Sequence, residues 1–329
     1  MSIQTKDYDG AAPGWMVWAA LWVIYIVWGS TYLAIRVTVE TLPPFLSAGA
    51  RFLLAGVIVY AVLALRRGVA AIRVTARELG ASALVGAALL FGGNGLVSVA
   101  EQEVSSSLAA LIIASVPLWV ILWRTLTGEK VSRGTLIGVA VGFAGVAMLV
   151  LPGGDSDANV AGLLTLVVAS ASWASGSFFS SRLPLPRDPF VSTAAQMVTG
   201  GIVLVLAGIV TGETSGLAPS EFSGASIGAF AYLVTVGSLF AFTCYVWLLQ
   251  NAPISKVATY AYVNPVIAIF LGWLILSESI TTTILVGAAV IVSSVAFIVS
   301  KESRPARAEA GDADAPAEAA LAGASSSSG

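Results

Sequence analysis

The feature of this sequence that most limits its fold is a series of ten apolar runs, each about 20 residues long. A helix rises about 1.5 Å per residue, so each run matches the ~30 Å hydrocarbon core of a bilayer. A membrane β-strand would instead alternate in polarity over about 10 residues, unlike the continuously apolar "GTLIGVAVGFAGVAMLVLP". We therefore predict ten transmembrane helices, near residues 15–35, 44–65, 79–99, 104–125, 134–151, 160–181, 189–211, 225–249, 256–276 and 281–300.

Composition supports an all-α integral membrane protein. The chain is 57% hydrophobic and only 10% charged, with a mean hydropathy of +0.90, whereas soluble domains are about 25% charged. So few polar side chains cannot cover a folded surface, and the lipid bilayer must cover part of it. The first run is too long for the apolar part of a signal peptide and lacks a clear cleavage site, so it is expected to stay as a helix.

The residue inventory argues against several classes of function. A net charge of -2 argues against a nucleic-acid partner. There is no histidine, and Cys244 is the only cysteine, so no metal site, cofactor site or Ser/His catalytic arrangement is expected. No G-x-x-x-x-G-K-[ST] motif occurs, so the chain is not expected to hydrolyse ATP. An enzyme within the membrane would need clustered His, Asp or Glu residues, and we expect no enzyme.

Basic residues predict the orientation in the membrane. All Lys and Arg residues except Arg36 and Arg51 fall in segments on the same side as the N-terminus. The excess of basic residues on cytoplasmic loops predicts a multi-pass protein of the plasma (inner) membrane with both termini cytoplasmic. The N-terminal tail, 1–14, is short and polar, and the C-terminal tail, 301–329, is rich in Ala, Ser and acids and is expected to be disordered.

The chain also repeats itself. "PFLSAGARFLLAGVIV" from Pro44 resembles "PFVSTAAQMVTGGIVL" from Pro189, and residues 100–117 align with 248–265, placing Gln102 over Gln250. Glu129 likewise aligns with Glu278. These matches divide the membrane part into two five-helix units, 15–151 and 160–300. Because five is odd, the second unit must be inverted relative to the first, as in many secondary transporters that work by alternating access.

Several motifs of the sequence resemble those of a known family. "WGSTYLAIRV" in the first helix, "ARFLLAG" in the second, "AEQ…SSLAALIIASVPLW" across the third and fourth and "GE" before the fifth resemble the drug/metabolite transporter (DMT) superfamily, EamA type. The resemblance implies a ten-helix transporter of two EamA repeats, usually an exporter of small metabolites such as amino acids, or of drug-like solutes. The alternative is a membrane protein with a structural or signalling role and no transport.

Polar and aromatic residues near the middle of the helices are candidates for the substrate pathway, since polar groups there are costly unless used. Each could instead serve helix packing or anchor a helix at the membrane interface. The candidates are Trp28, Tyr32, Asn94, Gln102, Ser115, Trp119, Trp173, Gln250, Tyr260 and Asn264.

Several further residues carry specific expectations. Pro117 and Pro265 align in the repeat, and each is expected to kink a helix. Glu101 is the best candidate for a proton-titrating carboxylate, although a solvated loop acid is the simpler interpretation. Glu129 and Glu278 are expected to stabilise the helix that follows each of them through its dipole. The glycine pattern Gly138–Gly142 suits contact within the bundle or a homodimer, and a monomer is equally compatible.

Arg51 is an intramembrane charge, about 10 Å along the second helix. Its repeat partner is Gln196, which is polar but neutral. Because both halves place a hydrogen-bonding side chain at this depth, the first hypothesis is an architectural role for Arg51. The second hypothesis is that Arg51 meets an anionic group of the substrate.

Overall fold

The computed structural model describes residues 13–151, 159–215 and 217–302, and within these ranges it contains helices and no strands. The first half contains α1 (Gly14–Thr38), α2 (Pro44–Arg67), η1 (Val69–Ile72), α3 (Ala76–Gly86), η2 (Ala87–Gly95), α4 (Leu96–Ala100), α5 (Ser106–Ile113), α6 (Val116–Leu126) and α7 (Arg133–Val150). The second half contains α8 (Val160–Ser180), α9 (Pro189–Val210), η3 (Pro219–Glu221), α10 (Gly224–Tyr232), η4 (Leu233–Phe240), α11 (Ala241–Asn251), α12 (Ile254–Val257), α13 (Tyr260–Leu276) and α14 (Thr282–Glu302).

Most of these helices join into membrane spans. In the described ranges, 9 helical segments are long and apolar enough to cross a membrane, and the apolar helix α13 is slightly shorter. The predicted all-α architecture is thereby confirmed. The third and eighth spans each contain a π-helical segment, η2 and η4, at equivalent places in the two halves.

Two spans are interrupted where the sequence predicted continuous helices. The fourth breaks between α5 and α6, so Pro117 lies in the first turn of α6 rather than inside a helix. Its missing N–H removes a bond to the preceding turn, which accounts for the break. The ninth is divided into α12 and α13, and Pro265 lies inside α13 as expected.

Local sequence explains where several helices begin. Thr75 and Glu78 form a reciprocal capping box at the start of α3. Side chains of Ser105, Asn159 and Asp188 accept hydrogen bonds from the first backbone N–H groups of α5, α8 and α9. Such caps stabilise a helix by about 1 kcal/mol each and set its first residue.

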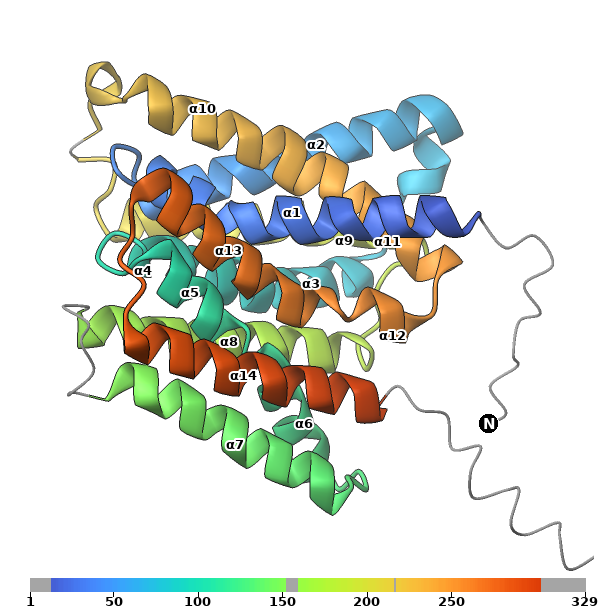
Figure 1. Cartoon of the computed structure of the whole chain (residues 1–329). Coiled ribbons are helices and arrows are strands. Elements are labelled where there is room, and N and C mark those ends of the chain that lie inside the picture. Colours follow the sequence, from blue (N-terminus) through green and yellow to red (C-terminus); the bar gives the residue numbers. More distant parts are fainter. Residues whose placement is uncertain (1–12, 152–158, 216, 303–329) are drawn as a thin grey trace, which may run out of the picture.

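The described ends of the chain, at Gly14 and Glu302, lie at the same end of the bundle (Figure 1). We call this the terminal end and the opposite one the distal end. The predicted tails lie outside the described residues, apart from the stretches nearest the helices. Gly14 already belongs to α1, and Lys301 and Glu302 complete α14 rather than starting a tail.

The contacts between helices repeat when the two halves are exchanged. In this exchange α1 corresponds to α8, α2 to α9, α3–α4 to α10–α11, α5–α6 to α12–α13 and α7 to α14. The pairs α2–α9, α5–α13 and α7–α14 map onto themselves. The contact of α1 with α13 matches that of α8 with α6, and the contact of α9 with η2 matches that of α2 with η4. The packing therefore has the two-fold pattern of an inverted repeat.

Glycines bring helices of the two halves close together. A Cβ on Gly86 of α3 would lie 2.6 Å from the Gln196 carbonyl oxygen, and a Cβ on Gly200 of α9 would lie 2.7 Å from the Gly86 oxygen. Gly138 and Gly142 of α7 face α14 and Leu118 of α6 within the bundle. Their small-residue pattern is thus used inside the protomer.

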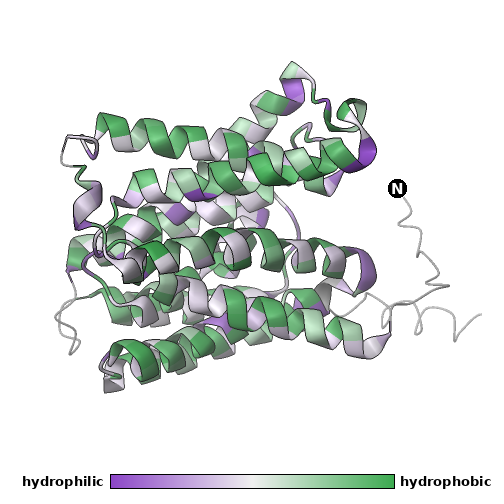
Figure 2. Cartoon of the chain, turned by 90° about the horizontal axis from the view of Figure 1, so that it is seen from above, coloured by the Kyte–Doolittle hydropathy of each residue, from purple (hydrophilic) through white to green (hydrophobic). Residues whose placement is uncertain are grey.

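Hydropathy follows the arrangement expected in a bilayer. Figure 2 shows apolar residues along the lengths of the helices and the most hydrophilic stretches mainly towards their ends. Large apolar side chains such as Leu65, Ile137 and Leu206 are exposed on the outside of the bundle. This surface suits contact with lipid, and the chain is a multi-pass membrane protein.

The contact of Gly86 with α9 generates a test of the fold. We expect Gly86→Ala to lower the free energy of unfolding by about 1–3 kcal/mol, because backbone must move to admit the methyl group. Gly80→Ala, on the same helix, is the matched control, since a Cβ there meets nothing within 4 Å. Unfolding in detergent would measure both, and equal stability of the two variants would contradict the close packing.

Candidate functional site

The candidate pathway residues fall into separate clusters around the interface of the two halves. One is aromatic and joins α1, α11 and α13. The Trp28 ring centroid lies 5.0 Å from that of Tyr245 and 5.1 Å from that of Tyr260, and the two tyrosine rings are 6.0 Å apart. Tyr32, one turn beyond Trp28, packs against the main core. Sequence reasoning missed Tyr245, which follows a π-helical segment that no sequence pattern revealed.

A second cluster is held by hydrogen bonds between the fourth and sixth spans. The Trp119 Nε1–H donates to Ser170 Oγ at 3.0 Å, and Ser115 Oγ donates to the same oxygen at 3.2 Å. Ser170 was not among the predicted candidates. Because these groups satisfy one another, the cluster in this conformation serves packing of α5–α6 against α8.

A third group surrounds η2. Asn94 lies in this segment, half-buried, and its side-chain amide has no hydrogen-bond partner among the described residues. A Cβ on Gly93 would lie 2.5 Å from Trp173 Cε3, so Trp173 is set directly against the η2 backbone. Trp173 thus contacts the third span as its repeat partner Trp28 contacts the eighth. An unpartnered amide on a π-helical segment is available to a ligand.

The remaining candidates, Gln102, Gln250 and Asn264, lie outside these three clusters. Gln102 is exposed at the distal end, where it lines a cavity of about 400 Å³ among the loops. Gln250 is exposed at the terminal end, so the two glutamines cannot contact one substrate together. Asn264 is buried in α13, where its amide is placed to donate to the carbonyls of Tyr25 and Tyr260.

Acidic side chains tie the two halves together at the distal end. The carboxylate of Glu278, between α13 and α14, accepts hydrogen bonds from the backbone N–H groups of Ser106 and Ser107 at 2.8 and 3.0 Å and from both serine hydroxyls. Glu213, after α9, accepts from the N–H groups of Phe45 and Leu46 at the start of α2, at 3.1 and 2.9 Å. Glu278 therefore caps a helix of the other half, and the expectation that it stabilises the following helix was wrong.

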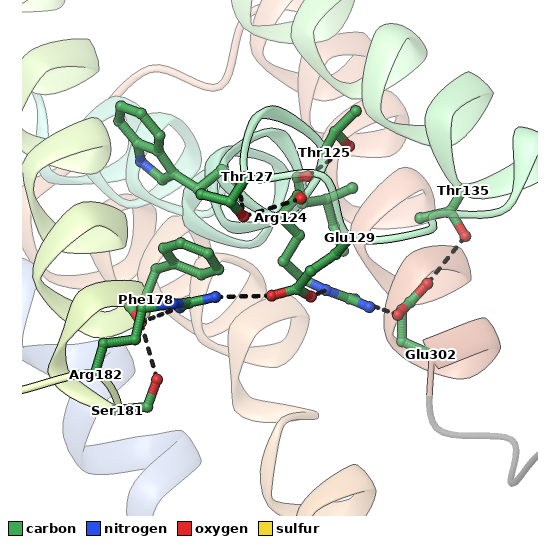
Figure 3. Close-up of polar contacts among 11 residues, drawn as sticks. Arg124, Thr125, Thr127, Glu129, Thr135, Phe178, Ser181, Arg182 and Glu302 are labelled. Atoms are coloured by element: carbon green, nitrogen blue, oxygen red, sulfur yellow. Dashed lines mark hydrogen bonds and ion pairs between the residues drawn. The ribbon is translucent and has the colours of Figure 1, made fainter.

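At the terminal end the repeat partner of Glu278 has different contacts (Figure 3). Glu129 accepts from Arg124 Nε and Arg182 NH2, both at 2.8 Å. These hydrogen bonds, chiefly the one from Arg124, lower the pKa of Glu129. Arg124 also pairs with Glu302 of α14. In the described contacts the two ends of the bundle thus differ, because Glu278 binds backbone N–H groups at a helix start, whereas Glu129 binds arginine side chains.

Glu101 is buried rather than solvated. It follows α4 at the distal end with a side chain 0% exposed, and neither carboxylate oxygen has a hydrogen-bond partner. Arg36 NH1 donates to the backbone oxygen of Glu101. Burial, and to a smaller extent the nearby Glu278, raises the pKa of Glu101 well above the usual range, while Arg36 opposes this shift. Burial without hydrogen-bond partners disfavours the charged form of a carboxyl group relative to the neutral form.

Arg51 on α2 is also buried, and its Nε donates to Ser238 Oγ on η4 at 2.8 Å. Its repeat partner behaves differently, because Gln196 Nε2 donates to Ser192 Oγ on its own helix at 3.0 Å. Arg51 therefore links the two halves, whereas Gln196 does not. Within the described ranges no group of three or more side chains suited to hold a metal ion occurs.

Comparison with known proteins gives one consistent result. The sequence profile of the EamA-like transporter family matches residues 15–151 and 160–300. An uncharacterized inner membrane transporter of Escherichia coli, YedA, is 38% identical over 283 residues, which are 86% of this chain and 90% of that protein. An uncharacterized transporter of Bacillus subtilis, YvbV, is 27% identical, covering 84% of this chain and 90% of its own. A solved crystal structure has the same fold, with a TM-score of 0.59, 21% identity and coverage of 88% of this chain and 97% of that chain.

The burial of Glu101 predicts a specific pH dependence of stability. An unfolded glutamate ionises near pH ~4.3, whereas folded Glu101 keeps its proton to higher pH because its pKa is raised. The folded state then binds more protons, so stability falls as pH rises from ~4.3 towards the folded pKa, by at most about 1.4 kcal/mol per pH unit. Glu101→Gln should remove this slope, and the exposed neighbour Glu103 gives the control Glu103→Gln. Identical slopes in the wild type and Glu101→Gln, measured by thermal unfolding, would show that Glu101 is already ionised in the folded state.

Proposed function

The chain belongs to the EamA-like transporter family, and from that premise we propose that it is a secondary transporter that works by alternating access. Its solutes are small organic metabolites, either amino acids or drug-like compounds, and it exports them. It lies in the inner membrane with both termini in the cytoplasm, and it has no catalytic activity of its own. The two EamA repeats, 15–151 and 160–300, are the units that move against each other.

The observation that carries this proposal is a difference between the two ends of an otherwise symmetric bundle. The helix contacts have a two-fold pattern, so exchanging the conformations of the halves gives a second state with the same kinds of contact. At the distal end Glu278 caps α5 across the halves. In the described contacts its counterpart Glu129 pairs instead with two arginine side chains, Arg124 of its own half and Arg182 of the second half. This combination supports a conformation closed at the distal end, with a counterpart closed at the terminal end.

The distribution of charge supports the orientation. Described basic residues such as Arg66, Arg124, Arg182 and Lys256 lie at the terminal end of the bundle, while Glu40, Glu213 and Glu278 lie at the distal end. Basic residues gather on the cytoplasmic side of membrane proteins. The terminal end is therefore the cytoplasmic end, and a conformation closed at the distal end faces inwards.

Solute counterflow tests the proposed function. Liposomes with purified protein are loaded with an unlabelled amino acid or dye and diluted into a trace of the labelled compound. A secondary transporter should accumulate label transiently, several-fold above empty liposomes, because exchange through one site needs no external energy. If no labelled amino acid or dye crosses under any gradient, the chain is a membrane protein without transport activity.

A further inference from the structure

Arg51 is a buried cation in the outer third of a membrane span. It lies about 10 Å from the distal start of α2, and only 7% of the residue is exposed. Its Nε–H donates to Ser238 Oγ on η4, and its Cζ lies 4.7 Å from the centroid of the neighbouring Phe52 ring. The side chain thus sits at the contact between the first half and the second.

No charge within the described part of the chain balances Arg51. None of the ion pairs there includes it, and its terminal nitrogens, NH1 and NH2, have no hydrogen-bond acceptor among the described residues. Taking an unpaired ion out of water costs several kcal/mol. A role that needed only a hydrogen bond to Ser238 would be met by a neutral side chain, so the charge itself requires an explanation.

The backbone of η4 lies close to NH2 of Arg51, with room there for one methyl group. Gly237 of η4 has no side chain, and a Cβ added there would lie 3.5 Å from Arg51 NH2 and 3.4 Å from Thr31 Cγ2 on α1. Ser30, the chain neighbour of Thr31, shares a hydrogen bond of 2.6 Å with the Tyr232 hydroxyl of α10. The NH2 group of Arg51 therefore lies beside a glycine of the second half.

The equivalent place in the second half is closed. There Gln196 bonds within its own helix, and the facing backbones meet at Gly86 and Gly200, where an added Cβ would lie 2.6–2.7 Å from a carbonyl oxygen. A scaffold function shared by the repeats would give both halves the same arrangement. Of the two repeat partners, only Arg51 is charged and has terminal nitrogens without an acceptor among the described residues.

We propose that Arg51 binds the carboxylate of the transported solute, which makes small organic carboxylates, free amino acids among them, the substrate class. This inference rests on the proposed transport function. A guanidinium matches a carboxylate with two parallel N–H···O bonds, and the ligand supplies the negative charge that the chain lacks. The site lies where α1, α2 and η4 meet, so the solute contacts both halves at once.

The inference is tested with pairs of compounds, each an amino acid and its amide, in which a neutral carboxamide replaces the charged carboxylate. Purified protein is screened for thermal stabilisation by each amino acid and by its amide, and the same compounds compete in counterflow. The wild type should bind the carboxylate about 10- to 100-fold more tightly than the amide, the range of a charge-assisted hydrogen bond. Arg51→Gln should abolish this preference, Arg51→Lys should retain part of it, and the control Gln196→Ala should keep it whole. A phosphate headgroup of lipid on Arg51 would give no such preference.

A second readout separates binding from a scaffold role. Because the charge of Arg51 has no partner in the chain, Arg51→Gln without solute should unfold at the same temperature as the wild type or a higher one. A scaffold arginine would instead be needed for stability. Gly237→Ala, whose methyl group meets its neighbours at ordinary contact distances, should fold normally and weaken carboxylate binding by filling the space beside NH2.

The outcomes are distinguishable. The anion site is overturned if the wild type binds carboxylate and amide equally. It is also overturned if Arg51→Gln keeps the preference for the carboxylate. A lowered unfolding temperature of Arg51→Gln with unchanged carboxylate preference assigns the residue to the scaffold and also overturns it. A third outcome combines two results: carboxylates stabilise the wild type but not Arg51→Gln, and counterflow fails for every solute. This outcome supports the anion site and rejects the transport function.

Discussion

The close approach of α2 and α9 is the interaction on which the rest of the bundle depends. It is one of three contacts, with α5–α13 and α7–α14, at which the two halves meet through corresponding helices. A Cβ on Gly49 would lie 2.9 Å from the Val205 backbone nitrogen, and one on Gly201 would lie 2.9 Å from the Leu53 nitrogen. In lipid there is no hydrophobic force between helices, so association relies on such close packing. With α2 and α9 in contact, η4 faces α2 and η2 faces α9, and these two contacts hold Arg51 on α2 and Asn94 on η2.

The sequence was sufficient to predict the ten spans and their inverted repeat, because both appear as patterns within the chain. Apolar run length reflects bilayer thickness, and aligned motifs reflect a shared fold. The interruptions were harder to predict. Pro117 and Pro265 align, yet only the first lies beside a break. Whether a proline kinks or interrupts a helix depends on which neighbours satisfy the freed carbonyls, and neighbours are not visible in the sequence.

The polar contacts of the candidate site were the least predictable part. Glu278 was visible as an aligned acid, but its partners Ser106 and Ser107 are about 170 residues away and belong to the other half. Ser170, Ser238 and Tyr245 were missed because hydroxyl groups in apolar helices are common and mostly bond their own backbone. The burial of Glu101 was also hidden, since an acid beside a helix end is ordinarily solvated. Arg51 was found from the sequence because charge inside an apolar run is rare.

Alternating access requires the two halves to exchange conformations. Spin labels can test it at two exposed, repeat-related pairs, Gln102 with Ser279 at the distal end and Gln250 with Lys130 at the terminal end, after replacement of the single cysteine, Cys244. Pulsed electron resonance would measure both distances in liposomes with and without a transported solute. If the halves exchange conformations, each pair should show two distance populations, and the solute should separate one pair while it brings the other together. Shifts in the same direction, or single distances that do not respond to the solute, would contradict it.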